Sequence, residues 1–385
     1  MTAQSPDKEL VLEGLLGIPF FDGNRIDVLK NGVEIFPAML DAIREARESI
    51  EFLTFVYWQG DIAVRFAEAL ADRARAGVAV RVLLDSFGAR PMRDTLIETM
   101  TEAGVDVRWF RPLETWRVWT IDNRTHRKIL IVDGRVGFTG GVGIASEWEG
   151  DARDVTEWRD SHFRITGPAV HGLRGAFLGN WAESGGEMRS LADHVPRLER
   201  AGEARLQIVR STASIAWSDV TTLFDLMSEI ARKQLRIATA YFVPDDDMVR
   251  HLVDAAGRGV TVQIMLPGAH SDQRVSQLAG EAEYRALLEG GVDIRSYEKT
   301  MLHTKIVTVD GELACIGSPN ANERSMRQDD EVAVVVSHPE TVAVLDRHFD
   351  EDLAHCQDID LDAWKDRGIG QRLLETAMQP FRREF

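Results

Sequence analysis

The residues best suited to chemistry occur in two copies of one short pattern. Each copy has a histidine, a lysine two positions later and an aspartate five positions after the lysine. The copies are His126, Lys128 and Asp133, and His303, Lys305 and Asp310. With 10 histidines in the chain, roughly 0.04 such matches are expected by chance from average composition. Two imidazoles and two ammonium groups around one point suit a phosphate, because one imidazole can attack phosphorus while the other protonates the leaving oxygen and the lysines bind the other oxygens.

Strand geometry separates the members of the pattern. Side chains alternate between the two faces of a strand, so the histidine and the lysine of each copy share one face. The aspartate lies an odd number of positions from the lysine, and Asp133 and Asp310 should therefore point the other way. We predict that these two aspartates are structural and that the two His-Lys pairs are the working groups.

The elements around each copy also repeat. Segments with helical periodicity alternate with short apolar runs, and residues 75–80 and 102–107 resemble residues 257–262 and 289–294. Strands that alternate with amphipathic helices indicate α/β layers. We predict two similar lobes, each a mixed, mostly parallel sheet flanked by helices, packed about a pseudo-twofold axis. A site at their junction would take one His-Lys pair from each lobe.

The predicted lobes span residues 1–190 and 203–385. The glycine-rich and charged stretch 185–202 is the best candidate for the linker between them. In the second lobe, the pattern over residues 272–288 predicts one continuous helix.

Composition narrows the class of protein. The chain has 385 residues, a formal net charge of -17 and two cysteines, too few for a disulfide framework or a four-ligand metal site. The negative charge argues against a protein that coats nucleic acid. The N-terminus lacks the basic and apolar regions of a signal peptide, and no apolar run reaches the ~18 residues of a membrane span. We expect a cytoplasmic protein, peripherally associated with the inner face of the cell membrane.

The paired motif resembles that of the phospholipase D superfamily, and the flanking phrases are most similar to bacterial cardiolipin synthases that lack N-terminal membrane spans. The resemblance runs from about Gly23 to Phe349. Its flanking phrases are residues 23–25, 123–128, 138–141, 158–160, 241–246, 266–268, 302–305, 317–320, 324–325 and 330–332. It implies the phospholipase D fold and a transphosphatidylase that needs no cofactor and no metal.

The resemblance also implies roles for individual residues. His126 would be the nucleophile that carries a phosphohistidine, and His303 the general acid and base. Lys128, Lys305 and Asn320 would hold the phosphate. In related enzymes an acidic residue 25 to 35 positions after each histidine orients the imidazole, which indicates Asp160 and Glu331; a carboxylate there fixes the tautomer and stabilises the imidazolium.

The sequence departs from the family at two places. Where the family has an asparagine after its first Gly-Gly pair, this chain has Gly143, which offers only its backbone to the substrate. Losing one such hydrogen bond costs on the order of 2–4 kcal/mol in comparable oxyanion sites. The family's Asn-Asp-Glu near the second motif is Asp329, Asp330 and Glu331 here. Ser318 and Gly143 are predicted to contact substrate.

Aromatic residues interleave with arginines just before the first motif. Trp116 and Trp119 belong to this loop and are predicted to contact substrate at a lipid interface. Stacking on single-stranded nucleic acid and a core edge with solvated arginines remain alternatives. Residues 371–385 resemble an amphipathic helix that packs on its own lobe or docks on a membrane.

The predicted function is formation of cardiolipin from phosphatidylglycerol on a membrane surface. Hydrolysis of phospholipids to phosphatidic acid is the alternative within the same chemistry. A nuclease of the superfamily and a non-catalytic binder of lipid head groups are further alternatives, and the negative charge argues against nucleic acid. The sequence identifies no protein partner.

Overall fold

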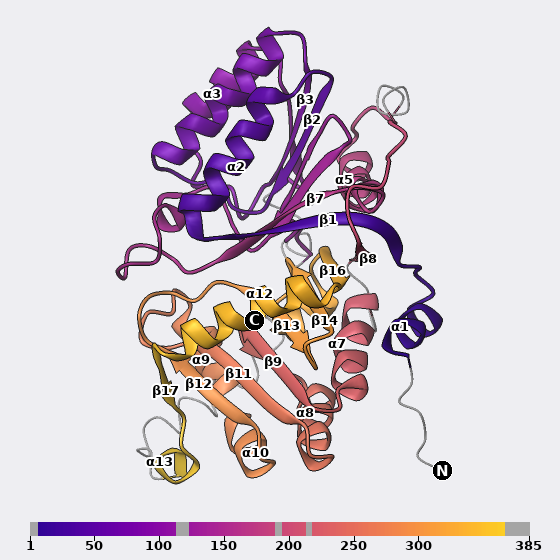
Figure 1. The fold of residues 1–385 in the computed structure, drawn as a ribbon. Helices are drawn as coiled ribbons and strands as arrows, with labels where there is room; N and C mark the ends of the chain where they lie inside the picture. The colour runs from indigo at the N-terminus through magenta and orange to yellow at the C-terminus, as the bar shows by residue number, and fades with distance from the viewer. Residues whose placement is uncertain (1–6, 113–122, 189–194, 213–217, 366–385) are drawn as a thin grey trace.

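The computed structural model describes residues 7–112, 123–188, 195–212 and 218–365. Within these ranges, 15 strands form one continuous sheet (Figure 1). Trp116, Trp119, the predicted helix 371–385 and the middle of the predicted linker lie outside the described residues.

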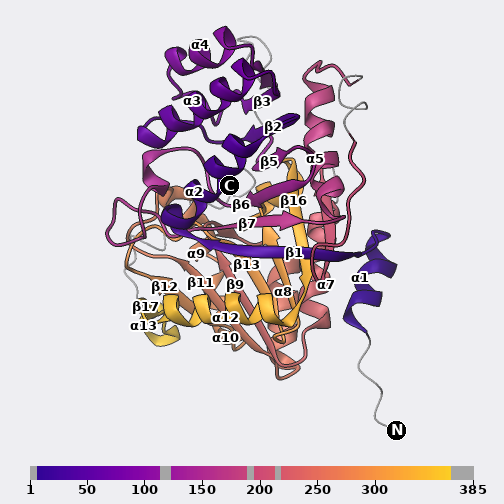
Figure 2. The ribbon, with the colours of Figure 1, turned by 45° about the horizontal axis from the view of Figure 1, so that its top comes forward.

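Each lobe contributes one half of the sheet. Equivalent strands of the two lobes follow the same order from the outer edge of the sheet toward its centre. From its outer edge inward, the first half is β4 (Asp106–Phe110), β3 (Ala79–Asp85), β2 (Ser49–Thr54), β5 (Ile129–Val132), β6 (Val136–Gly140), β7 (Ser161–Thr166) and β1 (Phe21–Lys30). The second half is β17 (Cys356–Asp358), β12 (Asp293–Tyr297), β11 (Thr261–Pro267), β9 (Gln234–Thr239), β13 (Lys305–Val309), β14 (Leu313–Gly317), β16 (Glu331–Ser337) and β8 (Ala204–Ser211). Strand β1 runs along the boundary and pairs with β8 (Figure 2). The predicted pair of α/β lobes related by a pseudo-twofold axis is confirmed.

The sheet is less parallel than the sequence predicted. In the large sheet, parallel pairing is confined to β2–β3–β4 and β9–β11–β12, on the outer side of each lobe. The central strands are antiparallel because each motif continues into a tight hairpin, and such a connection joins only antiparallel strands. A further small parallel pair joins β10 (Phe242–Val243) to β15 (Ala321–Asn322).

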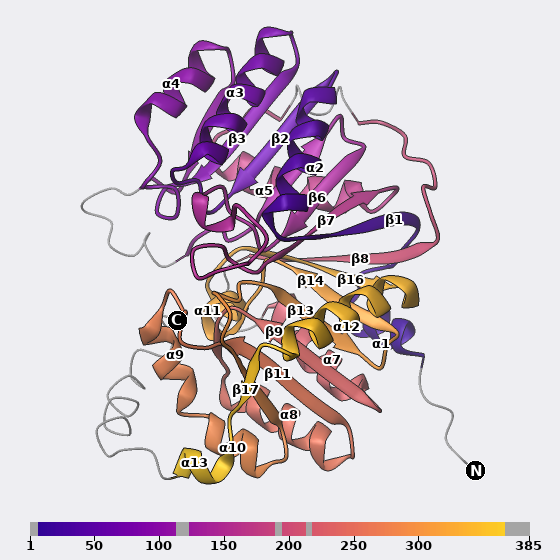
Figure 3. The ribbon, with the colours of Figure 1, turned by 60° about the vertical axis from the view of Figure 1, so that its left-hand side comes forward.

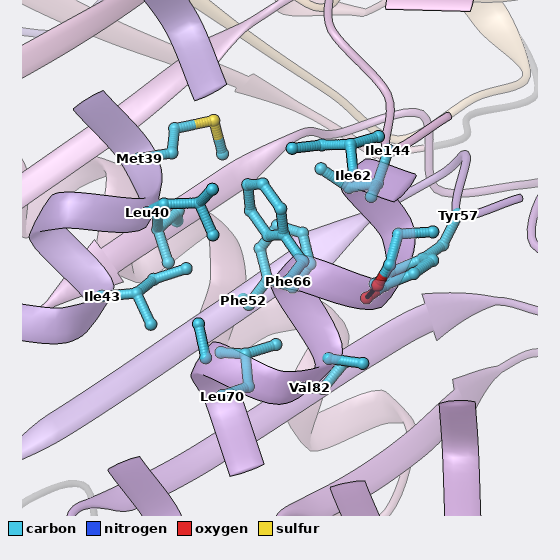
Figure 4. Packing of buried hydrophobic residues seen from close by; sticks show 14 of the residues in the cluster. Met39, Leu40, Ile43, Phe52, Tyr57, Ile62, Phe66, Leu70, Val82 and Ile144 are labelled. Atoms are coloured by element: carbon cyan, nitrogen blue, oxygen red, sulfur yellow. Dashed lines mark hydrogen bonds between the residues drawn. The ribbon is translucent and has the colours of Figure 1, made fainter. Parts of the chain in front are cut away.

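Helices cover both faces of each half-sheet (Figures 1 and 3). One face carries α2 (Asn31–Glu45), α3 (Asp61–Arg75) and α4 (Asp94–Glu102) in the first lobe, and α7 (Asp219–Ile230), α8 (Asp246–Gly257) and α10 (Tyr284–Glu289) in the second. The opposite faces share a third core under α5 (Val170–Glu183) and α12 (Pro339–Leu353). Figure 4 shows the first of these cores, where the rings of Phe52 and Phe66 lie 6.0 Å apart.

Two details differ from the lobe and helix predictions. Helix α1 (Lys8–Leu16) belongs to the proposed first lobe by sequence, but its Leu12 packs in the core of the second lobe. The helix predicted over residues 272–288 is divided into α9 (Arg274–Glu281) and α10. Near the break, the backbone of Gly280 lies against the carbonyl of Phe242, at a distance that leaves no room for a Cβ atom. The remaining elements are η2 (Ser146–Trp148), α11 (Glu323–Arg327) and α13 (Leu361–Lys365).

The aspartate of each motif lies at the tip of its hairpin. Asp133 and Asp310 have φ angles of 52° and 57° and are each followed by a glycine that also has positive φ, as type I′ turns require. The carboxylate of Asp310 accepts backbone N–H groups of residues 232–234 at 2.7 to 3.2 Å. Asp133 accepts those of residues 47–49 at 2.7 to 3.1 Å. Each aspartate therefore ties its hairpin to the segment that enters the neighbouring strand.

A buried ion pair supports the segment that leads to His126. Nε of Arg124 lies 3.1 Å from both carboxylate oxygens of Asp85, and both side chains are fully buried. The same carboxylate accepts the backbone N–H of Thr125 at 3.1 Å. This pair fixes the chain one residue before the first catalytic candidate.

Replacing Asp85 tests this support. Asp85→Ala leaves Arg124 buried without its counter-charge, so the free energy of unfolding should fall by about 3–5 kcal/mol. Chemical denaturation followed by circular dichroism measures the loss. The matched control is Asp72→Ala, because Asp72 pairs with Arg75 at 3.0 Å on the surface and its loss should change stability by less than about 0.5 kcal/mol. Equal effects of the two substitutions would contradict the role given to Asp85.

Candidate active site

Two short backbone bridges hold the lobes together beside the two histidines. Asp330 pairs with Thr125, and the N–H of His126 donates to the carbonyl of Asp330 at 2.9 Å. Arg159 pairs with Leu302 in the same way, and the N–H of His303 donates to the carbonyl of Arg159 at 2.7 Å. Each histidine is thus held by a segment of the other lobe.

The carboxylates are exchanged between the lobes. Nδ1 of His126 lies 2.9 Å from Oε1 of Glu331, and Nδ1 of His303 lies 2.7 Å from Oδ2 of Asp160. The spacing along the chain had associated each carboxylate with the histidine of its own lobe, and the structure corrects that assignment. The reason is that the loop after β6 and the start of β16 both cross the junction, so that each carboxylate meets the opposite motif.

Each carboxylate has a further donor that fixes its orientation. Nε1 of Trp148 donates to Asp160 at 2.8 Å. The hydroxyl of Ser318 donates to Glu331 and accepts the N–H of Val332. The hydroxyl of Ser318 therefore orients Glu331, and the substrate contact that the sequence predicted for Ser318 stays a prediction.

The two lysines lie beside their own histidines. Nζ of Lys128 donates to the carbonyl of His126 at 2.8 Å, and Nζ of Lys305 donates to that of His303 at 2.6 Å. Nζ of Lys305 also lies 3.4 Å from Nε2 of His303. All four side chains are nearly buried, and an ammonium group has three donors, so each lysine retains donors for a phosphate oxygen.

Burial and neighbouring charge set the protonation of the imidazoles. Burial lowers the pKa of His126 to about 4, and the charge of Lys128 lowers it too, against the opposing effect of Glu331. Burial and Lys305 likewise lower the pKa of His303 to about 3. At neutral pH both rings are therefore neutral. The carboxylate at Nδ1 selects the Nδ1–H tautomer, which places the lone pair on Nε2.

The pKa values of the lysines and carboxylates around the imidazoles are also lowered. Burial lowers the pKa of Lys128 to about 7, together with the charge of Lys305, and burial lowers the pKa of Lys305 to about 8. Burial alone would raise the pKa of Glu331, but His126, the charge of Lys128 and the hydroxyl of Ser318 together hold that pKa below its ordinary value. The pKa of Asp160 is held low in the same way, against burial, by His303. The site at pH 7 thus contains two carboxylates and two easily neutralised lysines.

Aromatic rings surround the two imidazoles unequally. The ring of Phe55 meets His126 edge-on, with centroids 5.2 Å apart. Trp148 and Trp158 lie 5.0 and 5.3 Å from the ring of His303. These contacts restrict rotation of both rings and contribute to the desolvation that lowers their pKa values.

Asn320 and Gly143 occupy equivalent positions after β14 and β6 but differ in their surroundings. Asn320 is 3% exposed, and its Oδ1 has no hydrogen-bond partner among the described residues. A Cβ atom at Gly143 would lie 2.6 Å from Cβ of Val56. The asparagine that the family has here could not fit without moving Val56. The absence of its amide is therefore linked to the way Val56 packs in the first lobe.

Three consecutive acidic residues each have a different partner. Asp329 accepts Nε of Arg324 at 3.1 Å, Asp330 accepts Nδ2 of Asn180 at 2.5 Å, and Glu331 binds His126. Burial raises the pKa of Asp329 to about 7. The Asp329 departure from the family therefore adds a group that titrates near neutral pH beside the site.

The comparisons with known proteins agree with this geometry. A family model described as cardiolipin synthase, PLD-like domain, matches residues 39–148 and 226–353. Cardiolipin synthase 1 of Bacillus anthracis is 34% identical over 379 residues, which cover 96% of this chain and 74% of that protein. Cardiolipin synthase of Geobacillus kaustophilus is 33% identical over 352 residues, 91% of this chain and 70% of that protein. This chain belongs to the cardiolipin synthase family of phospholipase D-like proteins.

The fold of this cardiolipin synthase family member also resembles a solved structure. A phosphatidylserine synthase from Haemophilus influenzae superposes with a TM-score of 0.73 at 15% identity, over 98% of this chain and all of that protein. The predicted superfamily, fold and phospholipase D-type enzyme class are confirmed. In length, the chain spans about three quarters of the two synthases above.

Sequence reasoning missed several residues that hold the site. Trp148 orients Asp160, and Arg127 donates to the carbonyl of Glu331 at 3.0 Å and to Asn180 at 2.7 Å. Arg127 was visible as the residue between the histidine and the lysine of the first motif, but its cross-lobe contacts were not. Among the described residues, no group of three or more His, Cys, Asp or Glu is placed to hold a metal ion.

The exchanged pairing can be tested without an activity assay. Glu331→Gln removes the charge that raises the pKa of His126, so the imidazole nitrogen shifts of His126 should change while those of His303 stay. Asp160→Asn should produce the reverse pattern. Nitrogen-15 spectra of histidine-labelled protein report both rings. Each substitution perturbing the histidine of its own lobe would contradict the exchange.

Proposed function

We propose that this protein is a phosphatidyltransferase that forms cardiolipin from two molecules of phosphatidylglycerol through a phosphohistidine. The observation that carries the proposal is the exchanged pairing of two histidines and two carboxylates, which assembles two oriented imidazoles and two ammonium groups in one site. The names of the related synthases support the choice of lipid.

In the first step, Nε2 of His126 attacks the phosphorus of phosphatidylglycerol. The P–N bond forms, the bond from phosphorus to the glycerol oxygen breaks, and His303 gives that oxygen a proton. The negative phosphate opposes the effect of the nearby ammonium groups and raises the pKa of His303 in the complex, so Nε2 of this ring takes up a proton from solvent as the substrate binds and holds it for the leaving oxygen. Free glycerol leaves.

In the second step, the hydroxyl of another phosphatidylglycerol takes the place of the glycerol. His303 accepts its proton, the new P–O bond forms, and the P–N bond to His126 breaks. Lys128, Lys305 and Asn320 bind the non-bridging oxygens in both steps. The products are cardiolipin and the restored enzyme.

The phospholipid places the reaction at a membrane surface, and we propose peripheral association on its cytoplasmic side. No helix in the described ranges is long and apolar enough to cross a membrane. Trp116 and Trp119 stay candidates for lipid contact, and the proposed lobe bounds of 1–190 and 203–385 stay proposals.

Product analysis tests the function. Purified protein in mixed micelles of phosphatidylglycerol should form cardiolipin and glycerol in equal amounts, measured by mass spectrometry. His126→Ala should lower the rate at least about 10³-fold because the nucleophile is lost. His251→Ala is the matched control, since His251 pairs with Asp225 between α7 and α8, and its rate should stay within about twofold. Phosphatidic acid as the sole product would reassign the acceptor to water, and no lipid product would contradict the proposal.

The lysines make a prediction about pH. A lysine is charged below its pKa, and those of Lys128 and Lys305 are about 7 and 8. The phosphate contacts should therefore weaken as pH rises, and kcat/KM should fall by about 10-fold per unit between pH 7 and 8 and by up to about 100-fold per unit above pH 8, where both lysines lose their charge. Initial rates at low substrate between pH 6 and 9.5 measure this, with circular dichroism to verify the fold. A rate that stays level or rises up to pH 9.5 would contradict the charges assigned to the lysines.

A further inference from the structure

A phenol and a carboxylate lie together on one side of the site. The hydroxyl of Tyr241, just after β9, donates to the carboxylate of Asp272, whose oxygens lie 3.0 and 2.9 Å away. Asp272 is in the exposed segment between β11 and α9. The mechanism above uses neither residue.

This pair adjoins the histidine that handles the alcohol. The rings of Tyr241 and His303 lie 6.1 Å apart and nearly perpendicular. Asp272 is also within electrostatic reach of Lys305: partial burial raises the pKa of the Asp272 carboxyl against the opposing effects of the Tyr241 hydroxyl and the Lys305 ammonium, and the carboxylate in turn opposes the lowering of the pKa of Lys305. The pair therefore faces the charged centre.

Among the described residues of the first lobe, no equivalent polar pair lies at this position. Thr54 and Thr239 end the matching strands β2 and β9, and their hydroxyls donate to the carbonyls of Val56 and Tyr241. Val56 is thus the counterpart of Tyr241. It packs against Gly143, and Phe55 lies against His126, so the first lobe has an apolar side chain where the second lobe has the hydroxyl of Tyr241.

We propose that Tyr241 and Asp272 form a subsite for the hydroxyl groups of the acceptor alcohol, so that a glycerol head group is chosen over water or a simple alcohol. The proposal rests on the function given above, in which His303 binds the departing and the incoming alcohol. The reacting hydroxyl gives its proton to His303, and a neighbouring hydroxyl of the same head group donates a hydrogen bond to Asp272.

The chemistry of the pair suits such a ligand. A carboxylate accepts up to about four hydrogen bonds, so Asp272 can accept from Tyr241 and from a ligand hydroxyl together. Hydrogen bonds to charged groups are stronger than those between neutral groups. A site that bonds a substrate hydroxyl discriminates against analogues that lack it. Ethanol and water have no second hydroxyl to place there.

Competition between acceptors tests the subsite. The enzyme is supplied with phosphatidylglycerol micelles, deuterated glycerol and ethanol, and the ratio of deuterated phosphatidylglycerol to phosphatidylethanol is measured. Tyr241→Phe and Asp272→Asn should each lower this ratio by about 10-fold, because each disrupts a hydrogen bond that involves a charged group. Asp225→Asn is the matched control, since Asp225 also accepts from a side chain, His251, and its ratio should equal that of the wild type.

The outcomes separate the subsite from the proposed function. An unchanged ratio in both variants, or an equal loss of both products, would overturn the subsite. Absence of cardiolipin from the wild type would overturn the function, while the glycerol-to-ethanol ratio still reports on the subsite. Should the wild type transfer to neither acceptor, saturation-transfer NMR with glycerophosphoglycerol decides. Its glycerol signals should respond in the wild type and in Asp225→Asn but weaken in both subsite variants, and equal responses would overturn the subsite.

Discussion

The exchange of carboxylates between the lobes is the interaction on which the site depends. His126 needs Glu331 from the second lobe, and His303 needs Asp160 from the first. Neither lobe alone can orient its own imidazole, so the β1–β8 pairing and the two backbone bridges are requirements of the chemistry as well as of the fold. This explains why the duplicated motif occurs within one continuous sheet.

Burial of the two lysines and two imidazoles disfavours their charged forms, and this same effect prepares the site for an anionic substrate. Two lysines held together out of water lose affinity for their protons, and burial, together with the charge of these lysines, keeps both imidazoles neutral. The two buried lysines are shielded from anions in the solvent, and the phosphodiester of the substrate supplies the negative charge that neutralises them. The same charge raises the pKa of the acid, so that binding the substrate also prepares the proton transfer. The fixed carboxylates provide the orientation in advance, so it need not be gained during the reaction.

Much of the site followed from residue types and spacing, because the motif repeats and each copy spans a strand, β5 or β13. The two lobes followed from the internal repeat, and the separation of the His-Lys pairs from the structural Asp133 and Asp310 followed from alternation along a strand. The partner of each carboxylate was not predictable, because spacing along a chain says nothing about which loop crosses a pseudo-twofold junction. The packing of Val56 against Gly143 and the hydrogen bond from Ser318 to Glu331 each lie within one lobe, and spacing along the chain did not reveal these side-chain contacts either.

A phosphatidyl donor whose leaving group departs without a proton would test most directly whether the two histidines have separate roles. With phosphatidyl-p-nitrophenol in a rapid-mixing experiment, His303→Ala should release about one equivalent of nitrophenolate per enzyme and then stop. The phosphatidyl group should then be found on His126 by mass spectrometry, since the base for the second step is missing. His126→Ala should release none. A burst from His126→Ala, or none from His303→Ala, would contradict the account.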